Sequence, residues 1–289
     1  MVLIPLVLLL ILRAPGWALT IVAGIVALLA IREFLELARH YSVEPSFFCT
    51  YIFVGIFFIV LARSARGHTM AAPLFMMGDV GVFAGLAPFV FLAIMMNRKN
   101  LKSAYPTAAA SVFAFTYIAV PLGLLVSLRR DLGGEFNVIH LMLVVWSGDI
   151  FAYFAGKSFG RHKMSPRVSP GKTWEGAAAS LLGSTVVGIL FYRYALPTSL
   201  WLIQFHLLSP GSNTWDYTQT PFWRVVFVSV LVNLAAQLGD LVESAIKRGA
   251  DVKDSGSILP GHGGMLDRID AMLFAVPVLL LSAKIWWRG

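Results

Sequence analysis

The sequence predicts an all-α integral membrane protein that crosses the bilayer many times. Of its 289 residues, 58% are hydrophobic and only 13% are charged, and the mean hydropathy is +0.76. A soluble globular domain carries about 25% charged residues, so this chain has too few charges for that class. Apolar segments also recur along the whole chain, and a bilayer span needs about 20 mostly apolar residues.

By this criterion about nine segments are expected to be transmembrane helices. The first segment is short and resembles the apolar region of a signal peptide, but no basic residues precede it. We therefore predict a short first span, with a cleaved signal peptide as the alternative. The nine segments are 2–12, 17–38, 46–62, 79–97, 106–128, 136–156, 173–193, 222–246 and 267–287.

The chain is expected to form a single membrane-embedded domain over residues 1–289. It contains no internal repeat of the kind that marks many transporters, and no low-complexity tract or appended soluble domain. Within this domain we assign residues 1–135 to N-terminal spans. Residues 136–289 hold the polar segments described below and are expected to form the catalytic part.

Basic residues concentrate in connections that we place on the cytoplasmic side of the cell (inner) membrane. Lysine and arginine are enriched in cytoplasmic loops, and a net charge of +8 suits anionic lipid headgroups. The cytoplasmic connections are 98–105, 157–172 and 247–266, together with the 32–45 region. In this last region, we interpret Glu33, Glu36 and Arg39 as a solvated helix end.

Two other classes of function find no support in the composition. No basic patch interleaved with aromatic residues lies on a polar domain, so nucleic-acid binding is not expected. The single cysteine, Cys49, rules out an internal disulfide framework, and no zinc-ligand spacing is present.

The richest polar segment runs from Ser244 to Asp270 and lies between two apolar spans. It contains Lys247, Arg248, Lys253 and Arg268, together with several acids, one histidine and a group of glycines. Hydrocarbon does not tolerate such a cluster unless the charges meet each other, a metal or a charged ligand. The segment is therefore the primary candidate for a functional site.

A stripe of polar residues follows one face of the eighth span. At 100° per residue its members fall within a face about 80° wide, so they are expected to face a protein interior or a wet cavity. Hydrogen bonding between helices is an open alternative for the two amides. It explains a carboxylate less well. The stripe consists of Asn233, Gln237, Asp240, Ser244 and Lys247.

The ninth span opens with two acids three residues apart, Asp267 and Asp270, which places them on one helix face. Capping of the helix explains one acid, but two acids here follow His262, Gly263 and Gly264. Glycines allow backbone N–H groups to approach a ligand, and a helix N-terminus favours anions. Acids for a divalent cation beside bases for phosphates indicate metal-assisted phosphoryl transfer. His262 could equally be a hydrogen-bonding loop residue.

A second polar group lies at 147–175. Asp149, Tyr153 and Lys157 follow at steps of four and predict a polar edge on the sixth span. Gly171, Lys172 and Thr173 are reminiscent of a phosphate-binding Walker loop. We reject that motif because Pro166 stands where it needs a glycine and no strand is predicted before it. Lys172 and Thr173 remain candidate phosphate contacts at a helix start.

The segment SAIKRGADVKDSGSILPGHGGMLDRID at 244–270 resembles the signature of the phosphatidate cytidylyltransferases, or CDP-diacylglycerol synthases. The match is uninterrupted. The segments SPGKTWEG, GDIFAYFAGKSFG and QLGDLVESAIKR are similar to the same family, so the resemblance covers roughly the C-terminal half. The N-terminal half agrees with the family in hydropathy and layout.

The resemblance implies that CTP and phosphatidic acid give CDP-diacylglycerol and pyrophosphate, in phospholipid biosynthesis. It also implies a homodimer in the membrane lipids, dependence on Mg²⁺ and a possible second cation, K⁺. The implied metal ligands are Asp240, Asp267, Asp270 and Asp254. The implied catalytic residues are Asp267, Lys253, His262 and Arg268, and the implied substrate-binding residues are Lys172, Thr173, Asp149, Ser244, Lys247, Arg248, Gly263 and Gly264.

Two alternatives stay open at this point. A CTP-dependent transferase acting on an isoprenoid lipid would need the same charged groups but a different acyl pocket. An ion-coupled membrane transporter would also place acids and lysines inside a helix bundle. A transporter would be expected to carry repeats or broken helices in corresponding positions, and the sequence contains neither.

Overall fold

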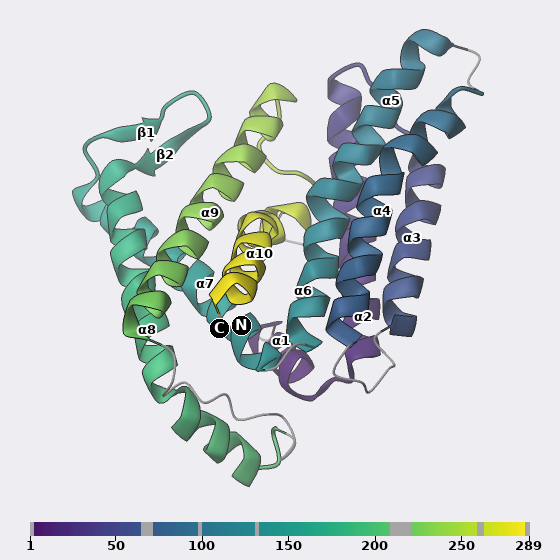
Figure 1. Cartoon of the computed structure of the whole chain (residues 1–289). Helices are drawn as coiled ribbons and strands as arrows, with labels where there is room; N and C mark the ends of the chain where they lie inside the picture. The colour runs from purple at the N-terminus through teal and green to yellow at the C-terminus, as the bar shows by residue number, and fades with distance from the viewer. Residues whose placement is uncertain are drawn as a thin grey trace. The chain divides into compact units, whose positions relative to one another are not determined.

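The computed structural model describes residues 3–64, 72–97, 100–130, 133–208, 221–258 and 263–286, and these residues are almost entirely helical. Figure 1 shows the helices in chain order. They are α1 (Leu3–Arg13), α2 (Gly16–His40), α3 (Phe47–Ser64), α4 (Ala72–Met95), α5 (Leu101–Ala114), η1 (Phe115–Ala119), α6 (Val120–Arg130), α7 (Gly134–Phe159), α8 (Trp174–Gln204), α9 (Phe222–Gly249) and α10 (Leu266–Trp286).

The prediction of an all-α, multi-pass membrane protein is confirmed. A helix occupies each of the nine predicted positions. Among the described residues, seven helices are long and apolar enough to cross a membrane: α2, α3, α4 from Met77, the continuous run from Leu101 to Arg130, α7, α8 and α9. Helix α1 has 11 residues and is shorter than the roughly 20 that a span needs. Helix α10 is also not among the seven.

The predicted span 106–128 is one continuous helical run with a π-helical turn inside it. This turn, η1, ends immediately before Val120 and Pro121. Proline has no backbone N–H and its ring crowds the preceding turn, and π-turns are a common way to absorb such an interruption. The run also starts earlier than predicted, at Leu101, and continues to Arg130.

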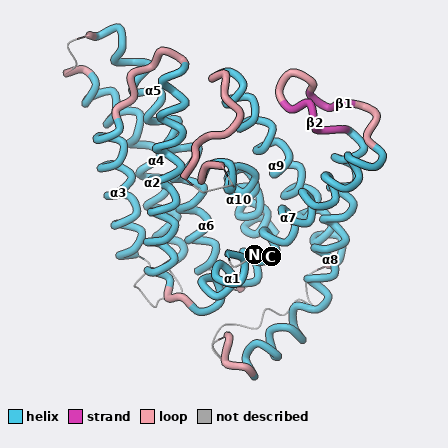
Figure 2. Tube along the Cα trace, turned by 180° about the vertical axis from the view of Figure 1, so that it is seen from behind, coloured by secondary structure: helices cyan, strands magenta, loops and turns pink. Residues whose placement is uncertain are grey.

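The chain forms two compact units, each assembled from separate stretches of sequence. Unit 1 comprises Met1–Pro15, Leu128–Val242 and Phe274–Gly289, and unit 2 comprises Gly16–Ser127 and Glu243–Leu273. In unit 2, helices α2 to α5 pack side by side (Figures 1 and 2). Their interior holds a cluster of rings in which Phe115 lies edge-on to Phe53 and Phe57, at centroid distances of 4.9 and 5.2 Å.

In unit 1, helices α7 and α8 pack closely at the end where Thr173 precedes the first residue of α8. Glycines make this approach possible. A β-carbon at Gly160 would lie 2.7 Å from Cγ2 of Thr173, and one at Gly176 would lie 2.9 Å from the carbonyl oxygen of Ala152. This packing fixes the start of α8 against the end of α7.

The connection from α7 to α8 contains a short antiparallel hairpin that the sequence did not predict. Its strands are β1 (Lys163–Ser165) and β2 (Ser169–Thr173), drawn in magenta in Figure 2. The expectation that no strand precedes Gly171-Lys172-Thr173 was therefore wrong, because these residues end β2 and lead directly into α8. Pro166, at the position where a Walker loop needs glycine, lies in the turn of this hairpin.

Candidate functional site

The first charged cluster, defined by Asp149, Lys172 and Asp240, lies in unit 1. Lys172 comes from strand β2 and its Nζ forms an ion pair of 2.7 Å with Oδ2 of Asp240 on α9. Asp149 on α7 lies within electrostatic reach of both. The Lys172 and Asp240 side chains are 25% and 38% exposed, whereas the Nζ atom of Lys172 itself is buried. Three elements thus bring together three of the predicted site residues.

The polar edge predicted on the sixth span is present at the end of α7. Lys157 Nζ lies over the Tyr153 ring, 5.8 Å from its centroid, as expected for residues on one helix face. Thr173, by contrast, is buried, and its Oγ1 accepts a hydrogen bond of 3.1 Å from the amide of Gly176. Its observed role is that of an N-cap for α8.

The two amides of the polar stripe on α9 make hydrogen bonds between helices. Asn233 Nδ2 donates to Oγ of Ser180 on α8 at 3.0 Å, and Gln237 Nε2 donates to the carbonyl of Ala177 at 3.3 Å. Gln237 Nε2 also donates to Oδ1 of Asn233 at 2.6 Å. For these two residues, the alternative of hydrogen bonding between helices is therefore confirmed.

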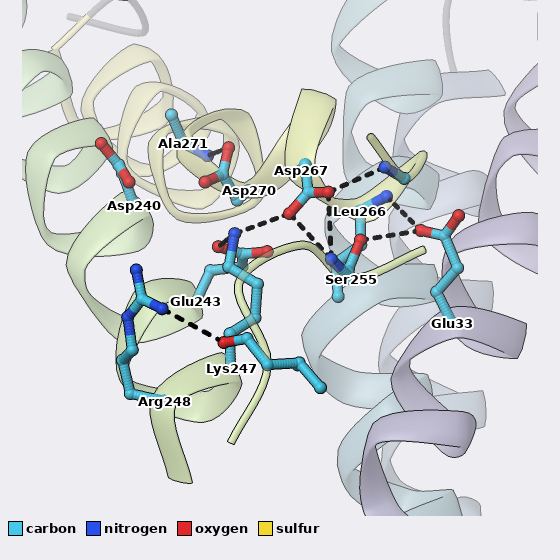
Figure 3. A network of polar contacts seen from close by, with 12 residues as sticks. Glu33, Asp240, Glu243, Lys247, Arg248, Ser255, Leu266, Asp267, Asp270 and Ala271 are labelled. Carbon is cyan, nitrogen blue, oxygen red and sulfur yellow. Dashed lines mark hydrogen bonds and ion pairs between the residues drawn. The ribbon is translucent and has the colours of Figure 1, made fainter. Parts of the chain in front are cut away.

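The second charged cluster, defined by Glu33, Glu243, Lys247, Ser255 and Asp267, lies in unit 2 (Figure 3). At its centre, Lys247 Nζ lies 2.6 Å from Oδ1 of Asp267 and 2.5 Å from Oε2 of Glu243. The Glu243 side chain is only 1% exposed and the Asp267 side chain 8%. The single ammonium group of Lys247 is therefore shared by two acidic side chains that are almost out of contact with water.

Asp267 is also held by backbone amides. Its Oδ2 accepts hydrogen bonds from the amides of Gly264 at 2.8 Å and Ser255 at 3.1 Å. Gly263 adopts a φ of +78°, which favours glycine, and a β-carbon there would lie 2.8 Å from Oδ2 of Asp267. The loop backbone therefore wraps closely around this carboxylate, and the Gly264 amide is used within the chain.

Glu33 is buried, which contradicts its interpretation as part of a solvated helix end. Its exposed fraction is 4%, and it accepts hydrogen bonds from Ser255 Oγ and from the amides of Met265 and Leu266. That interpretation holds for its neighbours, since Glu36 and Arg39 form an exposed ion pair of 2.8 Å.

Sequence reasoning missed Glu33 and Glu243. For Glu243 a signal existed, because glutamate four residues before Lys247 is the favoured spacing for an ion pair on a helix. For Glu33 the signal was weaker: an ionisable residue within an apolar span is itself a hint of function, but nothing local indicates its partners.

The remaining predicted site residues differ in their exposure. Lys253, Asp254, Arg248 and Arg268 are exposed, whereas Ser244 and Asp270 are partly buried. Asp270 Oδ1 accepts a hydrogen bond from the following amide, that of Ala271, at 2.7 Å. The prediction for His262 falls outside the described residues.

The residues predicted to bind a metal supply suitable donors without forming a ready-made cage. Carboxylate oxygens are the ligands that Mg²⁺ prefers. Within the described residues no group of three or more His, Cys, Asp or Glu side chains is arranged to hold a metal ion. Oε1 of Glu243 is buried and accepts no hydrogen bond from the described part of the chain, so it provides a further oxygen donor next to Asp267.

Fold and clusters together define a multi-pass membrane protein with acid–lysine pairs in polar segments at helix ends. The chain belongs to the Cytidylyltransferase family, whose model matches residues 1–286. Among its relatives is a phosphatidate cytidylyltransferase of Staphylococcus haemolyticus (strain JCSC1435), 30% identical over 266 residues, or 91% of this chain and 89% of the relative. Another is the phosphatidate cytidylyltransferase of Haemophilus influenzae (strain ATCC 51907 / DSM 11121 / KW20 / Rd), 31% identical over 88% of this chain and 85% of the relative.

Proposed function

We propose that this member of the family is a phosphatidate cytidylyltransferase, which converts CTP and phosphatidic acid to CDP-diacylglycerol and pyrophosphate. The observation that carries the proposal is the pairing of buried or partly buried acids with lysines, Lys172 with Asp240 and Lys247 with Asp267. Such groups suit a reaction between two polyanions. Relatives named for this activity that cover most of the chain support the choice of substrates.

In the proposed step, a phosphate oxygen of phosphatidate attacks the α-phosphorus of CTP. The new P–O bond forms as the bond from the α-phosphorus to the bridging β-phosphate oxygen breaks, and pyrophosphate leaves with that electron pair. A phosphate monoester has a second pKa of about 6 and is ionised near neutral pH, so the attack needs no strong general base. Positioning and charge neutralisation are the required contributions.

Lysine and arginine side chains are the proposed charge-neutralising groups. Lys172, on the flank of the glycine-containing hairpin, is proposed to contact the CTP phosphates. Lys247, with Arg248, Lys253 and Arg268, is proposed to receive lipid phosphate and pyrophosphate oxygens. In both clusters a phosphate would take the place of a carboxylate as the partner of the ammonium group.

We propose that Mg²⁺, with K⁺ as a second cation, is held by carboxylates of Asp240, Asp254, Asp267 and Asp270. When bound, a divalent cation supplies further neutralisation of phosphate charge. The protein is proposed to work as a homodimer in the cell membrane, with both charged clusters facing the cytoplasm, where CTP is present.

The assay that tests the proposal uses purified protein, Mg²⁺ and labelled CTP with phosphatidate, polyprenyl phosphate or no lipid. The expected outcome is a lipid-linked CMP and pyrophosphate with phosphatidate alone. Product with polyprenyl phosphate alone would support the isoprenoid alternative. No CTP consumption with any lipid would contradict both. Membership of a nucleotidyltransferase family already disfavours the transporter alternative.

A further inference from the structure

We infer that Glu33 is a positioning residue: a carboxylate on α2 that caps the N-terminus of α10 and thereby places Asp267 and Lys247. The kinetic effects expected of Glu33 rest on the proposed function. The cap itself can be measured independently of any activity. All of the residues involved lie in unit 2, and Figure 3 shows Glu33 beside Ser255 and the start of α10.

Both oxygens of Glu33 are used by the start of α10. Oε1 accepts from the Met265 amide at 2.9 Å, and Oε2 accepts from the Leu266 amide at 2.8 Å. The first amides of a helix have no partner within the helix and carry the positive end of its dipole. A carboxylate from another helix therefore does here what a local Ser or Asp does at most helix starts.

Ser255 joins this cap to the second acid. Its Oγ donates to Oε2 of Glu33 at 3.0 Å, while its own amide donates to Oδ2 of Asp267 at 3.1 Å. Asp267 in turn receives the ammonium group of Lys247 at 2.6 Å. Glu33 is thus linked through one serine to the acid–lysine pair, and the described hydrogen-bond donors to Glu33 are all neutral.

The loop backbone is built to accommodate this carboxylate. A β-carbon at Gly256 would lie 2.6 Å from Oε1 of Glu33, and one at Gly264 would lie 2.5 Å from Oε2. Glycine at both positions lets the chain approach the carboxylate from two sides. A buried charge is tolerated when several donors satisfy it, and this close approach is what brings the donors within reach.

The substitution Glu33→Gln tests the inference because the side chain keeps its shape and loses one acceptor. The NH₂ group of the new side chain would face an N–H of Met265 or Leu266, so one helix-start amide would lose its partner. Hydrogen–deuterium exchange of peptides covering 263–268 should accelerate about tenfold or more. The Mg²⁺ concentration for half-maximal activity should rise severalfold, while the KM for CTP should stay within about twofold.

Two further variants complete the experiment. Glu33→Asp keeps the carboxylate and should restore part of the exchange protection and of the Mg²⁺ response. Glu36→Gln, three residues on in the same helix and in an exposed ion pair, should leave both unchanged. Unchanged exchange in Glu33→Gln would overturn the inference. If exchange is faster in Glu33→Gln but the wild-type protein has no activity towards phosphatidate, the capping role of Glu33 stands and the proposed function is contradicted. If Glu33→Gln raised the KM for both substrates and the Mg²⁺ concentration for half-maximal activity by the same factor, Glu33 would have only a structural role, and the positioning of Asp267 and Lys247 would be contradicted.

Discussion

The Nζ atom of Lys247 lies 2.6 Å from Oδ1 of Asp267, although the two residues are 20 positions apart in the chain. Lys172 and Asp240 form an equivalent pair at 2.7 Å. In each pair an acid proposed to bind metal is neutralised by a lysine proposed to bind phosphate. Any ligand that takes one member must therefore compete with, or release, the other.

Asp267→Asn should abolish turnover while the protein still inserts into the membrane. The substitution removes the charge that holds Lys247 and a proposed metal ligand, and we expect a loss of about 100-fold or more. Pyrophosphate release from CTP and phosphatidate measures the loss. Asp251→Asn is a matched control, because Asp251 is exposed and has a φ of +56°, which asparagine also tolerates. Near-normal activity of Asp267→Asn would refute the metal assignment.

Lys172→Met should weaken CTP binding selectively. Loss of the ammonium group removes a phosphate contact and leaves Asp240 without this partner, so the KM for CTP should rise about tenfold or more. The KM for phosphatidate should change little. Lys163→Met, at an exposed position of the neighbouring strand, should behave like wild type. If Lys172→Met raised both KM values equally, a specific role in CTP binding would be excluded.

Thr173→Ala and Thr173→Ser separate the two roles considered for this residue. Loss of the cap on α8 should cost about 1 kcal/mol of stability, which serine should largely retain. A melting temperature measured in detergent, with the KM for CTP measured alongside, makes the distinction. A lower melting temperature with an unchanged KM would assign Thr173 to capping alone. A KM raised in Thr173→Ala, but not in Thr173→Ser, would support a hydroxyl contact with CTP.

Chelation with EDTA should stop turnover without unfolding the protein. Asp240 and Asp267 have ammonium partners within the chain, so we expect them to keep their folded positions when the cation is removed. Addition of Mg²⁺ should restore pyrophosphate release, and K⁺ alone should not. A large fall of the melting temperature in EDTA would instead indicate a structural metal.

Hydropathy and helical spacing predicted much of this fold. The nine apolar segments coincide with helices because a helix in hydrocarbon must be apolar along most of its length. The prediction that the polar stripe on α9 faces a protein interior was also correct for Asn233 and Gln237, since both form hydrogen bonds with α8. Such periodicities describe one element at a time.

Contacts between distant segments could not be predicted in this way. Glu33 and Ser255 are 222 positions apart, and no local pattern relates them. The hairpin was missed for a similar reason, because Pro166 and Gly171 argue against a strand and its pairing depends on residues across the turn. The ion pair of Lys172 with Asp240 follows from that hairpin, so it was missed as well.

The cap made by Glu33 has a consequence for the order in which the protein can mature. A polypeptide is synthesised from its N-terminus, so α2 exists long before residue 266 has been translated. Until then Glu33 lacks the complete set of three donors seen in the finished structure, because the Leu266 amide does not yet exist. The second charged cluster therefore cannot be completed before the last helix has emerged from the ribosome. A nascent chain truncated before α10 would carry the Glu33 carboxylate in its second helix without its Leu266 donor.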